Sequence, residues 1–452
     1  MEIFYRILEV INWIVIGISI LSFLFQFIMI AFVPLKPKKF PVTEKKSKVA
    51  ILICAKNESE VIKDTVTQIL EGQSYPKDMF DVFVVADNCS DNTATLAKEA
   101  RATVFIHNDN ASKTHRVAYA MKYGIENILK LEQNYDFMIR FDADNLPDKD
   151  YISKMNDAFD AYDGKCIITS FRNSKNFGSN IISGLYGVYF TTGCFMEMKG
   201  RTVLNCSTRV SGTGYVINSK YLKDGWKYVT LTEDWELTAD QIIDGNKIQY
   251  CDEAEYFDEQ PTTFKVMWRQ RVRWSRGHLL VCVTRLKELF RNLFAKKEKH
   301  ALKVSTYDMI ANIMPFGLIL TGLTILQVAL LLFTPLFVPS MTFGAVVLNW
   351  LKNFGMTCLV SYLMTFIGAI VIFIGERKRI QGVSFLKKVA LCLIWPFFLA
   401  IQLPIDVVAL FNKNCGWKVI PHNDTTDFEK LNKVAETVPA DVVEDDNTKS
   451  EL

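Results

Sequence analysis

The chain has 452 residues, half of them apolar and 22% charged, and its formal net charge is +3. Such a small charge gives no reason to expect a nucleic-acid partner, and the sequence has no zinc-finger, helix-turn-helix or RNA-binding signature. The ten cysteines show no CxxC and no metal-ligand spacing, so we interpret them as reduced thiols, most of them in a cytoplasmic domain. Length and composition together indicate one large polar domain enclosed by membrane segments.

Residues 1–35 predict a transmembrane anchor. Residues 11–33 form an almost uninterrupted apolar run that is long enough to span a bilayer. Lys36, Lys38 and Lys39 follow the run, whereas a cleaved signal peptide carries its charge before the apolar segment. This basic flank predicts that the domain after the anchor is cytoplasmic.

Residues 48–260 have the pattern of an α/β domain. Apolar runs at 49–54 and 81–86 are typical of strands covered on both faces, and 103–107 and 137–141 predict two further strands. Helical patterns lie between the runs, which predicts a doubly wound, mainly parallel sheet with ligands at the carboxyl ends of its strands. No GxGxxG or P-loop is present, which argues against a dinucleotide oxidoreductase or an ATPase.

Two aspartates, Asp142 and Asp144, follow the fourth predicted strand. Mg²⁺ or Mn²⁺ takes such carboxylate ligands and completes its shell with diphosphate oxygens. The ion would offset the charge that builds on a departing nucleoside diphosphate. A solvated turn is the alternative interpretation, because Asn145 to Asp148 are residues typical of turns.

A second acidic cluster, Thr232-Glu233-Asp234, begins a predicted helix. Asp234 is the candidate general base that would take the proton from an attacking hydroxyl. The alternative is an N-cap with acids in the first helical turn, which requires no chemistry.

Residues 261–303 mix aromatic and basic side chains immediately before a membrane segment. This mixture favours helices lying along the cytoplasmic membrane face over an ordinary surface helix. Within it, Gln270-Arg271-Val272-Arg273-Trp274 offers two guanidiniums that can brace a diphosphate and an indole that can stack on a sugar. A charged amphipathic face would explain the same residues.

Residues 304–412 predict about three more spans, at 310–338, 345–374 and 388–411. The basic cluster at 376–379 is expected in the cytoplasm. Counting then leaves the C-terminus outside, unless Pro396 and Pro404 turn the last segment into a re-entrant hairpin. Residues 413–452 predict a polar, partly disordered tail.

In this order the clusters resemble glycosyltransferase family 2, in particular the processive membrane synthases of cellulose, hyaluronan and poly-N-acetylglucosamine. The resemblance covers residues 49–277 and consists of a first aspartate, an Asp-x-Asp, a Thr-Glu-Asp and a Gln-x-x-Arg-Trp. It implies a GT-A-like fold in the cytoplasm, inserted between transmembrane helices.

The resemblance also implies roles for individual residues. Asp87 and Lys113 would contact the nucleotide, Asp142 and Asp144 the metal and diphosphate, and Arg273 with Arg271 the diphosphate. Asp234 would be the base. The acceptor side would be formed by Trp274, Gly212, Thr213 and Glu233. Ala86 stands where many relatives have the first of two aspartates, so the uridine contact would depend on Asp87.

The predicted function is inverting, metal-dependent and processive transfer from a UDP-sugar, building a β-linked polysaccharide and passing it through the helices of a plasma-membrane enzyme. Two alternatives stay open: transfer of one sugar to a lipid or polyprenyl carrier, and a catalytically idle membrane protein that binds or transports. The expected partners are the UDP-sugar, the growing polysaccharide and the bilayer. Accessory secretion subunits or a homo-oligomer are left open.

Overall fold

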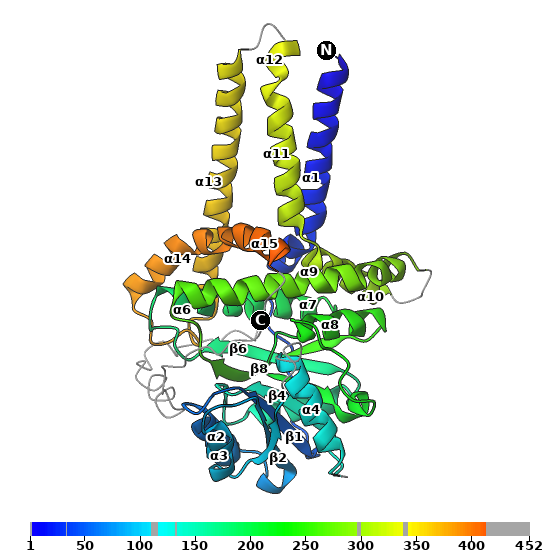
Figure 1. Ribbon diagram of the computed structural model, residues 1–452, viewed down its shortest axis with the longest axis vertical. Coiled ribbons are helices and arrows are strands. Elements are labelled where there is room, and N and C mark those ends of the chain that lie inside the picture. Colours follow the sequence, from blue (N-terminus) through cyan, green and yellow to red (C-terminus); the bar gives the residue numbers. More distant parts are fainter. Residues whose placement is uncertain are drawn as a thin grey trace, which may run out of the picture.

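The computed structural model describes residues 2–32, 34–109, 116–131, 133–295, 300–337 and 342–412. An α/β domain lies below three upright helices, α1 (Glu2–Ala31), α11 (Phe316–Leu332) and α13 (Phe343–Gly375) (Figure 1). A layer of helices lies crosswise between the domain and the upright helices. Lys113 and the tail at 413–452, both subjects of sequence predictions, lie outside the described residues.

The domain is built on an eight-stranded sheet with the order β3-β2-β1-β4-β7-β6-β8-β5. Strands β1, β2, β3 and β4 pair in parallel, and β6 pairs in parallel with β8. Strands β7 and β5 run antiparallel to their neighbours. The strands are β1 (Val49–Ala55), β2 (Phe80–Asp87), β3 (Thr103–His107), β4 (Phe137–Asp142), β5 (Leu146–Pro147), β6 (Ile167–Ser174), β7 (Tyr215–Asn218) and β8 (Ile248–Asp258).

Strand β1 explains why its sequence is apolar throughout. Its odd-numbered residues, such as Ile51 and Ile53, belong to the core cluster on one face of the sheet. Its even-numbered residues, such as Leu52, belong to the cluster on the other face. Helices α2, α3 and α5 cover the first face and α4 covers the second. This confirms the prediction of a doubly wound, mainly parallel sheet.

The helices of the domain are α2 (Ile62–Gly72), α3 (Thr93–Glu99), α4 (Val117–Leu129), α5 (Tyr151–Ala161), α6 (Ile181–Thr192), α7 (Lys199–Val203) and α8 (Glu233–Ile243). Shorter helical turns are η1 (Lys77–Met79), η3 (Gly193–Met198) and η4 (Ser219–Leu222). The turn η3 is a π-helix between α6 and α7, and such turns are frequent at functional sites.

The crosswise layer contains α9 (Phe264–Phe294), α10 (His300–Ile313), α14 (Phe385–Ala400) and α15 (Gln402–Phe411), and α12 (Thr334–Phe337) follows α11. Helix α9 begins after Thr263, whose side chain accepts a hydrogen bond from the backbone N of Val266 at 3.4 Å. On its upper side, Val272 packs against Ile405 and Ala409 of α15. Helix α9 therefore connects the α/β domain to the last helices of the described chain.

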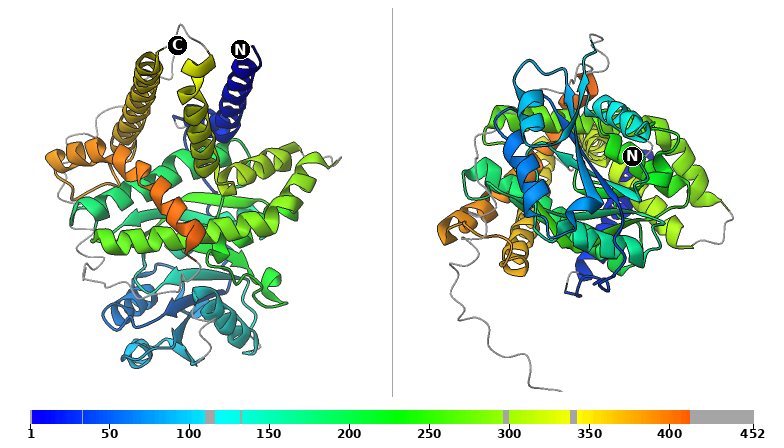
Figure 2. Two further views of the ribbon diagram at one scale, coloured as in Figure 1. Left: turned by 45° about the horizontal axis from the view of Figure 1, so that its top comes forward. Right: turned by 90° about the horizontal axis from the view of Figure 1, so that it is seen from below.

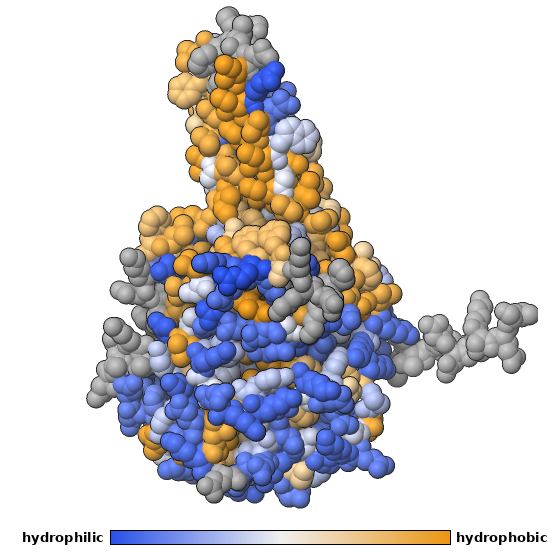
Figure 3. Space-filling view, turned by 90° about the vertical axis from the view of Figure 1, so that its right-hand side faces the viewer, coloured by the Kyte–Doolittle hydropathy of each residue, from blue (hydrophilic) through white to orange (hydrophobic). Residues whose placement is uncertain are grey.

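Four helical stretches of the described residues are long and apolar enough to cross a membrane: Arg6–Ala31, Phe316–Leu336, Phe343–Gly375 and Phe385–Phe411. Hydrophobic residues dominate the upright part of the molecule, and hydrophilic residues cover the domain (Figure 3). The fourth stretch does not stand upright with the others, because α14 and α15 both lie across the top of the domain (Figures 1 and 2). It is interrupted at residue 401, and Pro404 lacks the N–H that a continuous helix would bond there.

Candidate active site

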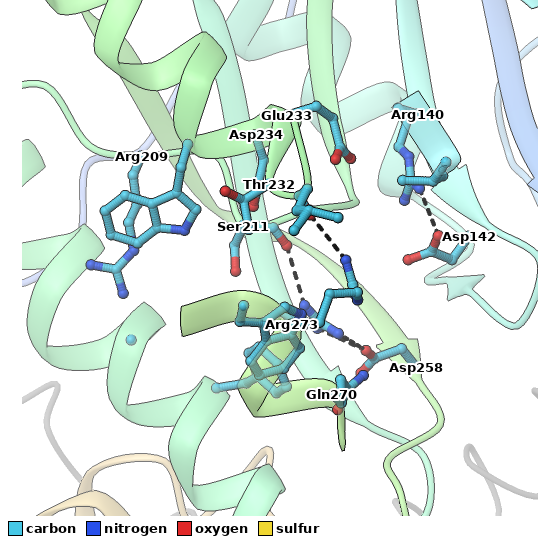
Figure 4. A pocket seen from close by; sticks show the side chains of 18 of the residues that line it. Arg140, Asp142, Arg209, Ser211, Thr232, Glu233, Asp234, Asp258, Gln270 and Arg273 are labelled. Atoms are coloured by element: carbon cyan, nitrogen blue, oxygen red, sulfur yellow. Dashed lines mark hydrogen bonds and ion pairs between the residues drawn. The ribbon is translucent and has the colours of Figure 1, made fainter. Parts of the chain in front are cut away.

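One cavity opens at the carboxyl ends of the central strands, between the sheet and α9, and encloses about 210 Å³ (Figure 4). Strand β4, the turn before β7, the first turn of α8 and one face of α9 all contribute to its wall. The predicted site residues that line it are Asp142, Asp144, Gly212, Glu233, Asp234, Arg273 and Trp274. Clusters that are distant in the sequence therefore meet in one place.

The two aspartates after β4 have different surroundings. Asp142 pairs with Nη2 of Arg140 at 2.7 Å, yet 41% of its side chain is exposed. Asp144 is buried, and its carboxylate accepts hydrogen bonds from Nδ2 of Asn145 at 3.1 Å and from the backbone N of Glu259 at 2.9 Å. Asp144 is thus held in a fixed orientation, whereas Asp142 faces the open cavity.

This donor set fits a hard divalent cation that is bound together with a substrate. Among the described residues, no group of three His, Cys, Asp or Glu side chains is arranged to hold a metal ion. Asp142 and Asp144 supply oxygen ligands only, so a Mg²⁺ or Mn²⁺ ion would take its remaining ligands from a diphosphate and water. Asp258, a residue that the sequence analysis missed, completes this acidic region. Burial raises the pKa of Asp258 to about 6, and the charge of Asp144 contributes in the same direction.

Glu233 and Asp234 occupy the first turn of α8, and the side chain of Glu233 lies between Asp234 and Arg140 (Figure 4). Burial and the neighbouring Asp234 raise the pKa of Glu233 to about 7. Burial also raises the pKa of Asp234. Gly212 has a φ of +79°, and a Cβ added to it would lie 3.9 Å from Oδ2 of Asp234. A glycine at 212 therefore suits both the backbone of this turn and the space beside the candidate base.

One face of α9 presents the Gln-x-x-Arg-Trp residues to the cavity. Arg273 donates a hydrogen bond from Nη1 to the carbonyl of Leu231 at 3.0 Å, immediately before the acidic cluster. Trp274 packs edge-on against Tyr186 and Phe190, with ring centroids 6.1 Å apart in each pair. The Oε1 atom of Gln270 is buried without a hydrogen-bond partner in the described part of the chain, which leaves an acceptor available to a ligand.

Arg271 does not line the cavity, although the sequence analysis grouped it with Arg273. Its Nη1 donates to the carbonyl of Phe398 at 2.9 Å, and its Nη2 donates to Oε1 of Gln402 at 2.8 Å. The reason is helical geometry, because residues two positions apart point to opposite sides of a helix. Arg273 faces the cavity, and Arg271 consequently faces α14 and α15.

Two more predicted residues lie outside the cavity lining. Asp87, at the end of β2, is fully buried, and its Oδ1 lies 2.6 Å from Nδ1 of His107, while its Oδ2 has no partner in the described part of the chain. Thr213 lies beneath the site, where its hydroxyl accepts a hydrogen bond from the backbone N of Asp142 at 3.0 Å. Thr213 thus positions an aspartate of the cavity.

The cavity wall also contains residues for which no motif was recognised in the sequence: Arg116, Arg140, Arg172, Arg209, Trp235, Asp258 and His278. Arg172 donates from Nε to Asp258 at 2.7 Å, and Arg209 lies over the ring of Trp235 at 5.3 Å. Two of these residues could have been found from their positions in the sequence, because Trp235 directly follows the acidic cluster and His278 lies one helical turn after Trp274.

Comparison with known proteins agrees with this geometry. The family model described as "Glycosyltransferase like family 2" matches residues 47–277. The probable glycosyltransferase YdaM of Bacillus subtilis is 30% identical over 259 residues, which cover 54% of this chain and 58% of that protein. A poly-β-1,6-N-acetyl-D-glucosamine synthase of Staphylococcus epidermidis is 24% identical over 351 residues, covering 75% of this chain and 78% of that one. This chain thus spans less than two thirds of the first of these relatives.

A solved structure shows the same fold. The mannosyltransferase PcManGT of Pyrobaculum calidifontis, in complex with GDP-Man and Mn²⁺, superposes with a TM-score of 0.53 at 13% identity and covers 89% of this chain and 100% of its own. The mostly parallel sheet is typical of the GT-A fold, as the resemblance implied. The family match includes every cluster that meets in the cavity. The chain therefore belongs to glycosyltransferase family 2.

Proposed function

We propose that this glycosyltransferase is an inverting, metal-dependent and processive enzyme that uses a UDP-sugar to extend a β-linked polysaccharide at the plasma membrane. The observation that carries the proposal is that Asp142, Asp144, Asp234, Arg273 and Trp274 line one cavity, although they come from the end of β4 and the turn after it, from α8 and from α9. An enzyme of this class needs a diphosphate site, a base and an acceptor platform within reach of one sugar.

The residues of the cavity supply each part of a direct displacement. An acceptor hydroxyl attacks the anomeric carbon of the donor, and the bond from that carbon to the diphosphate oxygen breaks as UDP leaves. Asp234 takes the hydroxyl proton. Asp142 and Asp144 would hold a divalent ion, which when bound offsets charge on the diphosphate. Arg273 adds charge-assisted hydrogen bonds to the same diphosphate.

Trp274 supports processive rather than single transfer. Its indole lines the cavity and is braced by Tyr186 and Phe190, so it offers a fixed surface for the terminal sugar of the acceptor. Such a surface holds the chain end while UDP leaves and the next donor binds. Helix α9, which carries Trp274, belongs to the crosswise layer between the domain and the upright helices, and this arrangement keeps the chain end close to the membrane.

The proposed organisation follows from the same arrangement. Helix α1 anchors the chain, the α/β domain lies in the cytoplasm, α9 and α10 lie along the membrane face, and α11 and α13 span the bilayer. The basic residues at 36–39 and 376–379 flank the cytoplasmic ends of α1 and α13 and support this orientation.

Membranes that contain the full-length chain test the proposal. They are incubated separately with individual UDP-sugars, beginning with UDP-N-acetylglucosamine because of the relative from Staphylococcus epidermidis. We expect one donor to give a ladder of products that a linkage-specific β-hydrolase digests, and EDTA to abolish the ladder until Mg²⁺ or Mn²⁺ is restored. A single product of fixed size would show transfer of one sugar instead, and full activity in EDTA would exclude the metal.

A further inference from the structure

The face of α9 that carries the Gln-x-x-Arg-Trp motif continues beyond it to His278. Gln270, Trp274 and His278 are four residues apart, and all three line the cavity. Four residues of an α-helix rise about 6 Å, so His278 lies one turn beyond Trp274 along α9. This separation is close to the length of one sugar unit.

His278 lies on the side of the cavity away from the metal aspartates. In Figure 4, Gln270 lies toward Asp258, whereas Arg209 lies beyond Asp234, on the other side. The guanidinium of Arg209 lies over the ring of Trp235, and the ring of Trp235 in turn lies 4.3 Å from the ring of His278. From Gln270 to His278, α9 therefore leads from the donor side of the cavity past the proposed platform for the terminal sugar.

The imidazole of His278 is held by packing, which is supported by a partly buried ion pair. Arg209 pairs with Glu197 of the π-helix η3, and Arg201 holds the same glutamate at 3.2 Å. Trp235 is consequently enclosed between Arg209 and His278. These contacts fix the orientation of the His278 ring and use none of its hydrogen-bonding capacity.

Both ring nitrogens of His278 are available to a ligand. Neither has a hydrogen-bond partner in the part of the chain that the structure describes, and the residue is half-buried in the cavity wall. Burial and the charge of Arg209 lower the pKa of His278 to about 3, so the ring is neutral at physiological pH. A neutral imidazole has one donor and one acceptor, which matches a sugar hydroxyl, because a hydroxyl also donates and accepts.

We propose that His278 is a further acceptor-binding residue, which hydrogen-bonds a hydroxyl of the second sugar unit, next to the reacting end of the acceptor. The inference rests on the proposed function, because it requires a saccharide acceptor whose terminal unit lies against Trp274. It adds a second subsite, positioned by Trp235 and Arg209, that distinguishes an oligosaccharide from a single sugar.

Acceptor length is the variable that tests this subsite. The full-length enzyme in detergent is assayed with UDP-N-acetylglucosamine and with N-acetylglucosamine or its β-linked disaccharide as acceptor. For His278→Ala we expect the KM for the disaccharide to rise about tenfold, as for the loss of a hydrogen bond of about 1.4 kcal/mol. The KM values for the monosaccharide and for the donor should stay within about twofold of wild type.

Two further variants separate a contact from a structural effect. His278→Asn keeps one donor and one acceptor and should restore most of the affinity for the disaccharide. Val283→Ala, on the same helix where the side chain is 83% exposed, should match wild type. UDP affinity measured by calorimetry checks that each variant is folded.

Different results overturn different claims. An unchanged disaccharide KM in His278→Ala, an equal rise for monosaccharide and disaccharide, or an asparagine variant as impaired as the alanine variant would refute the second subsite alone. If the wild-type enzyme transfers sugar to no saccharide acceptor, the proposed function fails and the subsite fails with it.

Discussion

Asp234 and Glu233 are adjacent acids, but they face different surroundings. Asp234 is half-buried beside Gly212 and lines the cavity, whereas only 5% of Glu233 is exposed. Both side chains line the cavity, and the more exposed of the two, Asp234, is the proposed base. The main effect of Glu233 is on the stability of the fold, through its buried charge.

Asp234→Asn keeps the shape of the side chain and removes its ability to accept a proton. We expect sugar transfer to fall by at least about 10²-fold, the usual scale for a general base, while UDP affinity stays within about twofold. Initial rates and calorimetry measure the two quantities. Asp244→Asn, at the C-terminal end of the same helix, is the matched control. Equal losses of transfer and UDP affinity would mean that Asp234 is structural.

The buried charge of Glu233 makes stability depend on pH. Its pKa is raised from 4.5 to about 7 in the folded protein, so the folded state binds this proton more tightly than the unfolded chain does. The contribution of Glu233 to the free energy of unfolding is therefore fully present below pH 4.5, and it is lost as the pH rises toward 7.

Glu233→Gln should remove this dependence. We expect the variant to have a higher Tm than wild type at pH 8, by about 2–4 °C for each kcal/mol gained, and the difference to disappear toward pH 5. Thermal unfolding in detergent across this pH range measures it. A variant that is less stable than wild type at pH 8 would show that the ionised carboxylate is stabilising.

The sequence predicted where the residues at the end of an apolar strand lie. Asp142 and Asp144 follow such a strand, so periodicity places them at the edge of a parallel sheet where ligands commonly bind, whereas the family resemblance was needed to place Asp234 beside them. Arg209 could not be identified in this way, because its position depends on its ion pair with Glu197 of η3 and on packing against Trp235 of α8. Such contacts between distant segments have no local pattern.

At the scale of elements, the parallel half of the sheet was predictable and the other half was not. Strands β1, β2 and β4 are largely apolar and buried on both faces, and β3 is a short, partly exposed edge strand. Strand β8 contains Asp252 and Glu255, whose charges are balanced by Arg379 from the loop after α13, at 3.1 and 3.3 Å. From its sequence, β8 looks too polar to be a buried strand, because the arginine that balances its charges comes from a segment far along the chain.

Helix α9 presents two arginines with different tasks. Arg271 is buried and bonds α14 and α15, and Ser275 on the same side donates to Asp406 at 2.6 Å. Arg273 faces the cavity. The upper face of α9 therefore carries contacts that hold the helix layer together, and the lower face carries the residues that line the cavity.

Replacing each arginine separates the two faces. Arg271→Ala should lower Tm by several degrees, since each hydrogen bond to a charged group contributes about 1.5–3 kcal/mol, and should leave UDP affinity within about twofold. Arg273→Ala should instead weaken UDP binding about tenfold or more with little change in Tm. Thermal unfolding and calorimetry on the two variants decide the assignment. A loss of UDP affinity in Arg271→Ala at unchanged Tm would instead support the diphosphate-binding role that the sequence analysis gave to Arg271.

At the scale of the whole molecule, the arrangement of the upright helices and the crosswise layer predicts on which side of the membrane the described chain ends. Helix α11 rises away from the domain and α13 returns to it, where Arg379 binds β8. Helices α14 and α15 then stay on the domain side and pack on α9. Counting apolar segments in the sequence leaves the C-terminus outside unless the last segment fails to cross the bilayer, and a count cannot distinguish a span from an apolar segment that lies flat.

Reporter fusions can test this topology in the intact membrane. Because α15 packs on α9, we expect alkaline phosphatase fused after Asn412 to be inactive and green fluorescent protein fused there to fluoresce. Phosphatase inserted between Phe337 and Thr342, at the far ends of α12 and α13, should be active, and phosphatase inserted after Lys46 should be inactive. Each fusion should retain sugar transfer, which shows that its helices are correctly inserted. An active phosphatase after Asn412, in a fusion that still transfers sugar, would mean that residues 385–411 cross the bilayer and that α14 and α15 do not lie along its surface.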